Sequence, residues 1–403
     1  MASVIVAGAT GAIGRSVVQH AIRQPSIQRV VALTRAANVT EANYAQLFGV
    51  GTQNHAAGGD ANSEREHLGS SSEVVMVTPQ EAAKIQPVTM DWEAFTNAWS
   101  TTSAAADSAA ATDALHTYKD IFAGHTYAAM CLGTTRKDAG SAAQFTRCDY
   151  DYVMAFTEAV LTYSAPAGLG PAAAFIHHVN DAGEVKKGAV SAQAAATAPT
   201  APPPPSSTSS ASAKSTGTLR AFCQISAAGA DSNSWFLYMR TKGNADEATV
   251  ERIHQHNKTA AAAAAPILLF LLRPGLLNRH GKSRWNEKLA KAILPSMPVE
   301  TCGAAAVSCF VEPEIRQAIT ATAPLSASAQ ATLDAQSQEM ARRGESTILL
   351  GNPFKTTTTM KKAGVPSEED FAYVYELTNS TIKHLAGRLT EENKAEATTA
   401  GEP

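Results

Sequence analysis

Short apolar runs alternate with amphipathic segments along much of the chain. Residues 3–7 form an apolar run that stops at Gly8, and apolar side chains then recur at helical spacing between residues 12 and 23. Such alternation is typical of a parallel sheet with helices on both faces. The sequence therefore predicts a doubly wound α/β fold, with strands at 3–7, 28–34, 85–90, 126–132, 219–225 and 267–272 and helices at 12–23, 149–162, 236–256 and 367–388.

Other stretches are rich in Ala, Ser, Thr, Gly and Pro, and Pro202 to Pro205 form the clearest example. Segments of this composition bury too little apolar surface to offset the entropy lost on ordering. We therefore expect a single domain over residues 1–390, a flexible tail at 391–403, and low-complexity surface insertions at about 51–80, 101–115, 165–217 and 320–347.

Charge and composition exclude several classes of function. A formal net charge of -3 gives no basic field for a nucleic acid, so we expect no nucleic-acid partner. The apolar stretch 260–272 is interrupted by Pro266, so we expect no membrane span, and the N-terminus shows no signal-peptide pattern. Five cysteines without a Cys-x-x-Cys pair argue against disulfides and a zinc ribbon. We expect a reducing compartment, namely the cytoplasm, with the nucleus as an alternative.

The histidines of the predicted helix at 236–256 are not spaced to bind a metal together. His254 and His256 stand two places apart on a predicted helix, and side chains at that spacing do not share a face. We therefore expect no metal.

Three glycines occupy the turn between the first strand and the first helix. Gly8 permits the tight turn, Gly11 lets the backbone approach a pyrophosphate at the positive end of the helix, and Gly14 allows close packing of helix on strand. A tight connection without a ligand is the alternative. The pattern favours a Rossmann-type fold that binds a dinucleotide through Gly8, Thr10, Gly11, Ala12, Ile13, Gly14 and Arg15.

The end of the second strand bears on which cofactor binds. Enzymes that use NAD usually place an acid there to bond the ribose 2′-hydroxyl, whereas this chain has Arg35. A guanidinium pairs well with a 2′-phosphate, and Arg15 could add a second charge. The sequence therefore favours NADPH or NADP over NADH, unless both arginines are ordinary solvated side chains.

A possible catalytic pair lies in the segment FLYMRTKG, residues 236–243, where Tyr238 stands four places before Lys242. The two side chains share one face of a helix, but pairs at this spacing are common on solvated helix surfaces. The pair alone is therefore a weak signal.

Several longer motifs resemble those of one family. The segment CLGTTRKDAGSAAQFTRCDYDYV at 131–153 resembles the Tat-interacting protein family of atypical short-chain dehydrogenases/reductases, which bind NADPH. The resemblance covers about 1–163 and 218–310, and its motifs follow in the family's order: GATGAIGR, MDWEAF, FAGHTYAAMCLGTTR, ISAAGAD, FLYMRTKG and FLLRPGLL.

The resemblance implies roles for three side chains. Tyr238 would be the general acid or base, Lys242 would bond the nicotinamide ribose and lower the pKa of the phenol, and Ser226 would bond the substrate carbonyl. The family has two consecutive serines where this chain has Ser226-Ala227, and this difference bears directly on activity.

Further cofactor contacts are expected where other strands end. Asp91 follows the third strand and would bond the adenine amine, with a helix N-cap as the alternative. Pro274 and Gly275 resemble a loop that passes the nicotinamide, with a plain strand terminator as the alternative. Leu132, Gly133 and Thr134 would pack along the ribose.

Two functions therefore compete at this point. The first is an NADPH-dependent reduction of a carbonyl-like small substrate of unknown identity. The second is an NADPH-binding regulatory protein that acts through protein partners, as the resemblance to regulators of transcription and nuclear transport implies. A scaffold in a larger assembly is a third, weaker alternative.

Overall fold

The computed structural model describes residues 2–52, 74–104, 117–165, 219–259, 266–278, 296–311 and 373–399. Most of each expected insertion lies outside these residues, as does 400–403 of the expected tail. The single-domain assignment stays a prediction.

Seven parallel strands form the main sheet, in the order β11-β8-β7-β6-β1-β2-β5. Counted along the chain, the order from β5 is third, second, first, fourth, fifth, sixth and seventh. The strands are β1 (Ala2–Ala7), β2 (Ile27–Thr34), β5 (Ile85–Thr89), β6 (Tyr127–Met130), β7 (Ala221–Ile225), β8 (Leu268–Leu272) and β11 (Val374–Leu377).

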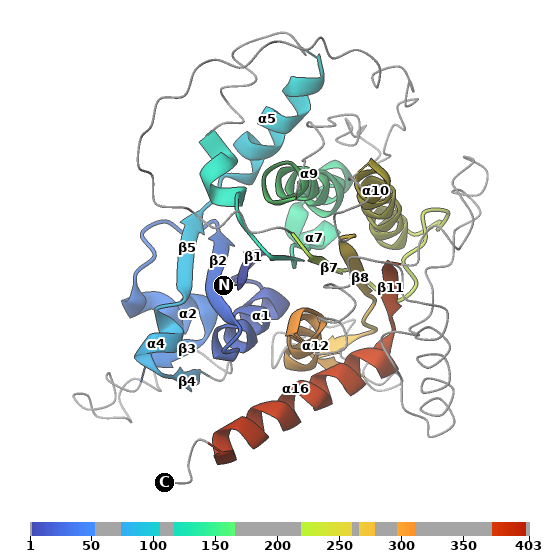
Figure 1. Cartoon of the computed structure of the whole chain (residues 1–403). Helices are drawn as coiled ribbons and strands as arrows, with labels where there is room; N and C mark the ends of the chain where they lie inside the picture. The colour runs from blue at the N-terminus through green and yellow to red at the C-terminus, as the bar shows by residue number, and fades with distance from the viewer. Residues whose placement is uncertain are drawn as a thin grey trace.

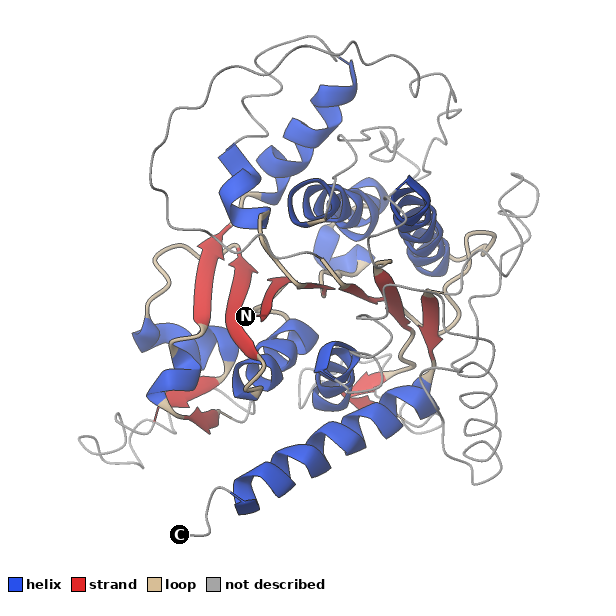
Figure 2. Ribbon diagram, viewed as in Figure 1, coloured by secondary structure: helices blue, strands red, loops and turns tan. Residues whose placement is uncertain are grey.

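Helices cover both faces of this sheet, as Figure 1 and Figure 2 show. One layer consists of α1 (Ala12–Arg23), α12 (Val299–Val311) and α16 (Asn379–Thr399), and the other of α5 (Trp92–Ala104), α9 (Tyr152–Ser164) and α10 (Leu237–Thr259). Side chains alternate between the two cores, because Val4 and Val6 pack toward α1 and α12 whereas Ile5 and Ala7 pack toward α5 and α9.

Smaller elements surround the sheet. Two short sheets pair β3 (Val50–Thr52) with β4 (Val75–Val77) and β9 (Leu277–Asn278) with β10 (Met297–Pro298). The remaining described elements are η1 (Glu41–Asn43), α2 (Tyr44–Phe48), α4 (Pro79–Ala82), α7 (Arg136–Ala139), α8 (Ala142–Thr146) and the π-helical turn η3 (Arg147–Asp151).

The predicted doubly wound α/β fold is confirmed by this strand order. The strand order reverses between β1 and β6. The next two strands of the sheet along the chain, β2 and β5, lie on one side of β1, and the sheet continues on the other side with β6, β7, β8 and β11. In open α/β sheets, ligands bind in the crevice at the carboxyl ends of the strands beside such a switch point. None of the helices in the described ranges combines the length and hydropathy that a bilayer crossing requires.

The prediction of one helix over 367–388 is wrong for its central part. Val374–Leu377 forms strand β11, which pairs in parallel with β8, and helix α16 begins only at Asn379. Aromatic and β-branched side chains in this segment suit a strand, and the open edge of β8 supplies the backbone partners. Helix α16 then continues to Thr399, into the stretch where the sequence offered no packing signal.

Candidate functional site

Steric fit requires glycine at two positions of the turn after β1. Gly8 has a φ of 72°, a conformation that side chains other than glycine rarely adopt. A Cβ atom on Gly14 would lie 2.1 Å from the carbonyl oxygen of Gly8, so helix α1 can approach the turn only because Gly14 has no side chain. The turn is closed by a hydrogen bond of 2.9 Å from the N–H of Gly11 to the Gly8 oxygen.

Helix α1 begins at this turn without a side-chain cap. Gly11 is its N-cap, and its first turn contains no acidic residue. The first N–H groups of a helix lack intrahelical acceptors and attract anions. Gly11 and Ala12 are exposed, Thr10 is half-buried, and Ile13 and Gly14 are buried. The turn therefore fits the pyrophosphate of a dinucleotide at its exposed positions.

The two arginines near this turn have different surroundings. Arg35 is exposed directly after β2. Arg15 donates a hydrogen bond of 2.7 Å to the carbonyl oxygen of Gln46, and burial lowers its pKa. Arg35 is thus the more available cation.

Asp91 serves as a helix cap in the structure. Its Oδ1 accepts hydrogen bonds of 3.0 Å from the N–H groups of Glu93 and Ala94, at the start of α5. The alternative reading of this residue as an N-cap therefore matches the geometry, and its bond to an adenine amine stays a prediction.

Lys242 is buried and held by an acid from another element. Its Nζ lies 2.9 Å from Oδ1 of Asp149, which belongs to the π-helical turn η3. The other oxygen of Asp149 accepts a hydrogen bond of 2.9 Å from the N–H of Thr134, in the loop that follows β6. Desolvation lowers the pKa of Lys242, but the attraction of Asp149 and then of Tyr238 outweighs it and raises the pKa overall. The ammonium is therefore fixed in its charged form at the crevice.

Tyr238 lies at the surface beside Lys242. Its side chain is 39% exposed, and its ring lies 5.9 Å from the ring of buried Phe145 in α8. The phenol therefore has a packed side and an open side, as a group that meets a ligand requires.

A continuous set of contacts joins this pair to the glycine turn. A Cβ atom on Gly8 would lie 3.0 Å from the backbone N of Leu132, so the turn touches the chain after β6. Next along that chain, a Cβ atom on exposed Gly133 would lie 3.5 Å from Nζ of Lys242. The structure thus brings Gly8, Leu132, Gly133 and Lys242 together at one edge of the sheet.

The hydroxyl of Ser226 is directed to a buried acid. Ser226 Oγ donates a hydrogen bond of 2.7 Å to Oδ2 of Asp246, and Gln224 Nε2 donates one of 2.8 Å to Oδ1. Arg273 completes the set with an ion pair of 2.9 Å to Asp246 Oδ2. Burial raises the pKa of Asp246, with Arg273 as the largest opposing influence. Ser226 itself is only 5% exposed, so its hydroxyl serves this cluster.

The loop after β8 is fixed by its neighbours. The carbonyl oxygen of buried Pro274 accepts a hydrogen bond of 2.8 Å from the N–H of Ala228, and the N–H of Gly275 donates one of 2.8 Å to Oδ1 of Asn379. A Cβ atom on Gly275 would lie 2.8 Å from Asn379 Nδ2, so glycine fits the close approach. The loop is therefore rigidly placed beside the end of β7.

Two acids at this site, Asp149 and Asp246, escaped the sequence reading. Asp246 stands four places after Lys242 and eight after Tyr238, so all three share one helix face. The sequence could therefore have indicated Asp246, because this acid lies on the helix face that carries Tyr238 and Lys242. Asp149 gave none, because its contact with Lys242 is made between distant parts of the chain.

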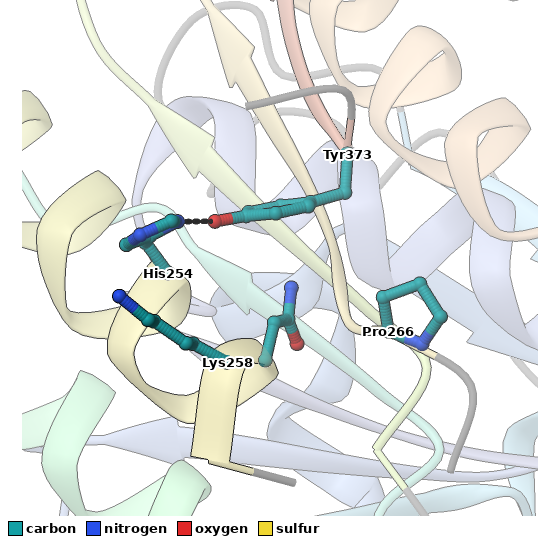
Figure 3. Close-up of a pocket in the computed structure, with 5 residues that line it drawn as sticks. His254, Lys258, Pro266 and Tyr373 are labelled. Atoms are coloured by element: carbon teal, nitrogen blue, oxygen red, sulfur yellow. Dashed lines mark hydrogen bonds between the residues drawn. The ribbon is translucent and has the colours of Figure 1, made fainter. Parts of the chain in front are cut away.

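A hollow of about 320 Å³ lies elsewhere, lined by His254, Asn257, Lys258, Pro266 and Tyr373. Figure 3 shows the Tyr373 hydroxyl directed at Nδ1 of His254. Because His254 lies sixteen residues beyond Tyr238 on α10, the two are about 24 Å apart along the helix axis. This hollow is not part of the candidate site.

No protein-family model matches the chain, and no curated protein shows significant similarity to it. The solved structures similar in fold include a UDP-glucuronic acid 4-epimerase from Bacillus cereus in complex with NAD, with 11% identity, 76% of this chain and 73% of that chain covered, and a TM-score of 0.35.

Two further structures are similar at the same level. A 3-oxoacyl-[acyl-carrier protein] reductase from Brucella melitensis in complex with NAD has 12% identity, 79% and 93% coverage and a TM-score of 0.41. A short chain dehydrogenase from Burkholderia cenocepacia J2315 in complex with NADP has 13% identity, 85% and 94% coverage and a TM-score of 0.38. The assignment of the fold rests on the strand order of this chain.

Proposed function

We propose that the chain binds NADPH at the switch point and reduces the carbonyl group of a small molecule, with Tyr238 as the proton donor. One observation carries this proposal: a partly exposed phenol lies beside the buried ammonium of Lys242, at the edge of the sheet that also carries the glycine turn. A charged, desolvated ammonium beside a phenol favours the phenolate that forms when the proton leaves.

The residues present fit NADPH. Its pyrophosphate would lie on the exposed start of α1, Arg35 would pair with the 2′-phosphate, and Lys242 would bond the ribose. The bound cofactor supplies a hydride. The proton must be delivered to the substrate by a side chain of this chain and replaced from solvent after each turnover.

Tyr238 and Lys242 would divide the work between them. The Tyr238 hydroxyl donates its proton to the oxygen of the substrate, and the Lys242 ammonium stabilises the phenolate left behind. Asp149 keeps Lys242 in place through the 2.9 Å ion pair, and its negative charge also offsets part of the ammonium's field. Asp149 therefore positions the lysine while moderating its effect on the phenol.

The direct test is turnover of NADPH by the purified protein against a broad set of carbonyl metabolites, followed by cofactor absorbance and product mass. We expect oxidation of NADPH that depends on a particular carbonyl compound and yields the matching alcohol. Binding of NADPH without consumption against the whole set would contradict the proposed reaction.

A regulatory protein that binds NADPH without consuming it is the second candidate. The observation that favours it is the Ser226 hydroxyl, which is donated to Asp246, while the next residue is Ala227 and carries no hydroxyl. Neither Ser226 nor Ala227, at the end of β7, therefore offers a side-chain hydroxyl to a substrate oxygen. This candidate expects NADPH to change the affinity of the chain for a protein partner, measured by co-purification from cell extract with and without NADPH.

A further inference from the structure

Most of the exposed large hydrophobic side chains among the described residues lie in one short segment. The exposed side chains are Met76, Trp235, Phe236 and Tyr238, so three of the four fall within four consecutive positions. Trp235 is 95% exposed and Phe236 is 77% exposed. Single exposed apolar side chains are ordinary, but adjacent aromatic rings facing water are typical of a binding surface.

The loop that carries these rings is held in one conformation. The carboxylate of Asp231 accepts a hydrogen bond of 2.9 Å from the N–H of Asn233, and the carbonyl oxygen of Asp231 accepts one of 3.0 Å from the N–H of Ser234. A Cβ atom on Gly243 would lie 2.2 Å from the N of Ser232, so the loop packs directly against α10. The rings are therefore presented by an ordered loop, which lowers the entropic cost of binding.

The size of this surface suits a small molecule better than a protein. An aromatic side chain buries about 150–250 Å² when fully covered, so Trp235 and Phe236 together offer roughly 300–500 Å². A stable protein interface buries about 800 Å² on each partner. The apolar part of a small substrate needs no more than these two rings provide.

We propose that Trp235 and Phe236 bind the apolar part of the substrate, so that the substrate class is alkyl or aryl carbonyl compounds. This proposal rests on the proposed reduction at Tyr238. Trp235 stands three places before Tyr238, in the loop directly before α10, so a carbonyl oxygen at the phenol leaves the rest of the molecule close to the rings. Tyr238, which is partly exposed, adds to the same surface.

The test measures binding without turnover. The protein is saturated with NADP+, which cannot reduce a ketone, and titrated with acetone and with 2-nonanone, which has six more methylene groups. Burial of one methylene strengthens binding about fourfold, so even partial burial of the chain should give 2-nonanone an affinity at least about 50-fold higher than that of acetone.

Two variants make this test specific. In a variant with both Trp235→Ala and Phe236→Ala, the affinity for 2-nonanone should exceed that for acetone by less than about fivefold, because the apolar contacts are gone. Met76→Ala removes an exposed hydrophobic side chain that lies on β4, away from α10, and should leave the ratio of the two affinities unchanged.

The outcomes separate this proposal from the proposed function. If 2-nonanone binds more tightly than acetone through the two rings, but no ketone is reduced when NADPH replaces NADP+, the binding surface stands and the reductase function fails. Equal affinities of acetone and 2-nonanone, or an advantage that survives in the double variant, would overturn the surface. A double variant that changes the oligomeric state in light scattering and leaves ketone binding intact would also overturn it, in favour of contact between copies of the chain.

Discussion

The two halves of the crevice are built in different ways. The glycine turn, residues 8–15, is shaped by the backbone itself through the φ of 72° at Gly8 and the close approach at Gly14. The charged half, which contains Lys242 with Asp149 and Ser226 with Asp246, is shaped by buried charges from distant segments. Substitutions that add atoms should therefore disturb the glycine turn most, whereas the loss of a charge or a change of pH should disturb the charged half most.

Removing the charge of Asp149 should have the largest effect on stability. Asp149→Asn keeps the shape but leaves the Lys242 ammonium buried without its partner acid, and breaking a buried pair in this way costs about 3–5 kcal/mol. The free energy of unfolding in denaturant should fall by this amount, and the affinity for NADPH should also fall.

Glu158→Gln is the matched control for this change. Glu158 forms a buried ion pair of 2.6 Å with Arg252, between α9 and α10 and outside the candidate site. We expect a similar loss of stability with unchanged affinity for NADPH. If both variants lose the same affinity for NADPH, Asp149 affects NADPH binding only through the stability of the fold.

Stability should also depend on pH through Asp151, which lies two residues after Asp149 in the same π-helical turn. Burial raises the pKa of Asp151 from 3.8 to about 7, with Arg147 as the largest opposing influence. The folded protein then keeps a proton that the unfolded chain loses, so this group lowers the free energy of unfolding as the pH rises from about 4 to about 7, by up to about 4 kcal/mol.

Denaturant titrations at several pH values check this contribution. Asp151→Asn should remove it, so that the variant gains stability relative to the wild type as the pH rises through this window. Parallel stability curves for the two proteins would show that the raised pKa is wrong.

In the glycine half, a single methyl group should weaken cofactor binding. Gly14→Ala places a Cβ atom about where the Gly8 oxygen lies, so the turn must move, and we expect the Kd for NADPH to rise at least about 100-fold. Gly387→Ala, in helix α16 with open space around its Cβ position, should leave the Kd unchanged. A wild-type Kd in Gly14→Ala would place the cofactor elsewhere.

Arg35 should have a smaller effect, confined to the choice of cofactor. We expect the protein to bind NADPH at least about tenfold more tightly than NADH, and Arg35→Ala to remove most of this preference. Arg15→Ala should change it less, because the Arg15 guanidinium already donates to the Gln46 oxygen. Calorimetric titration with both cofactors measures this, and equal affinities in the wild type would refute the assignment.

The difference between a turn shaped by its own backbone and charges that meet after folding also explains which features could be predicted from the sequence. Six of the seven strands of the main sheet, the helix at Ala12–Arg23 and the glycine turn follow from local patterns, and the structure reproduces their positions closely. Strand β11 was misread because its pairing depends on the distant edge of β8. Asp149 and the bond from Ser226 to Asp246 were missed for the same reason, since a buried charge finds its partner only after folding.

The central claim is that Tyr238 donates a proton beside a cofactor held by the rest of the crevice. The most direct measurement compares Tyr238→Phe with the wild type for NADPH-dependent turnover of the best carbonyl substrate and for NADPH affinity. We expect a loss of turnover of at least about 100-fold, with the Kd for NADPH within about twofold of the wild type, because the hydroxyl supplies a proton while the ring only packs. Turnover in Tyr238→Phe at the wild-type rate would show that Tyr238 is not the proton donor.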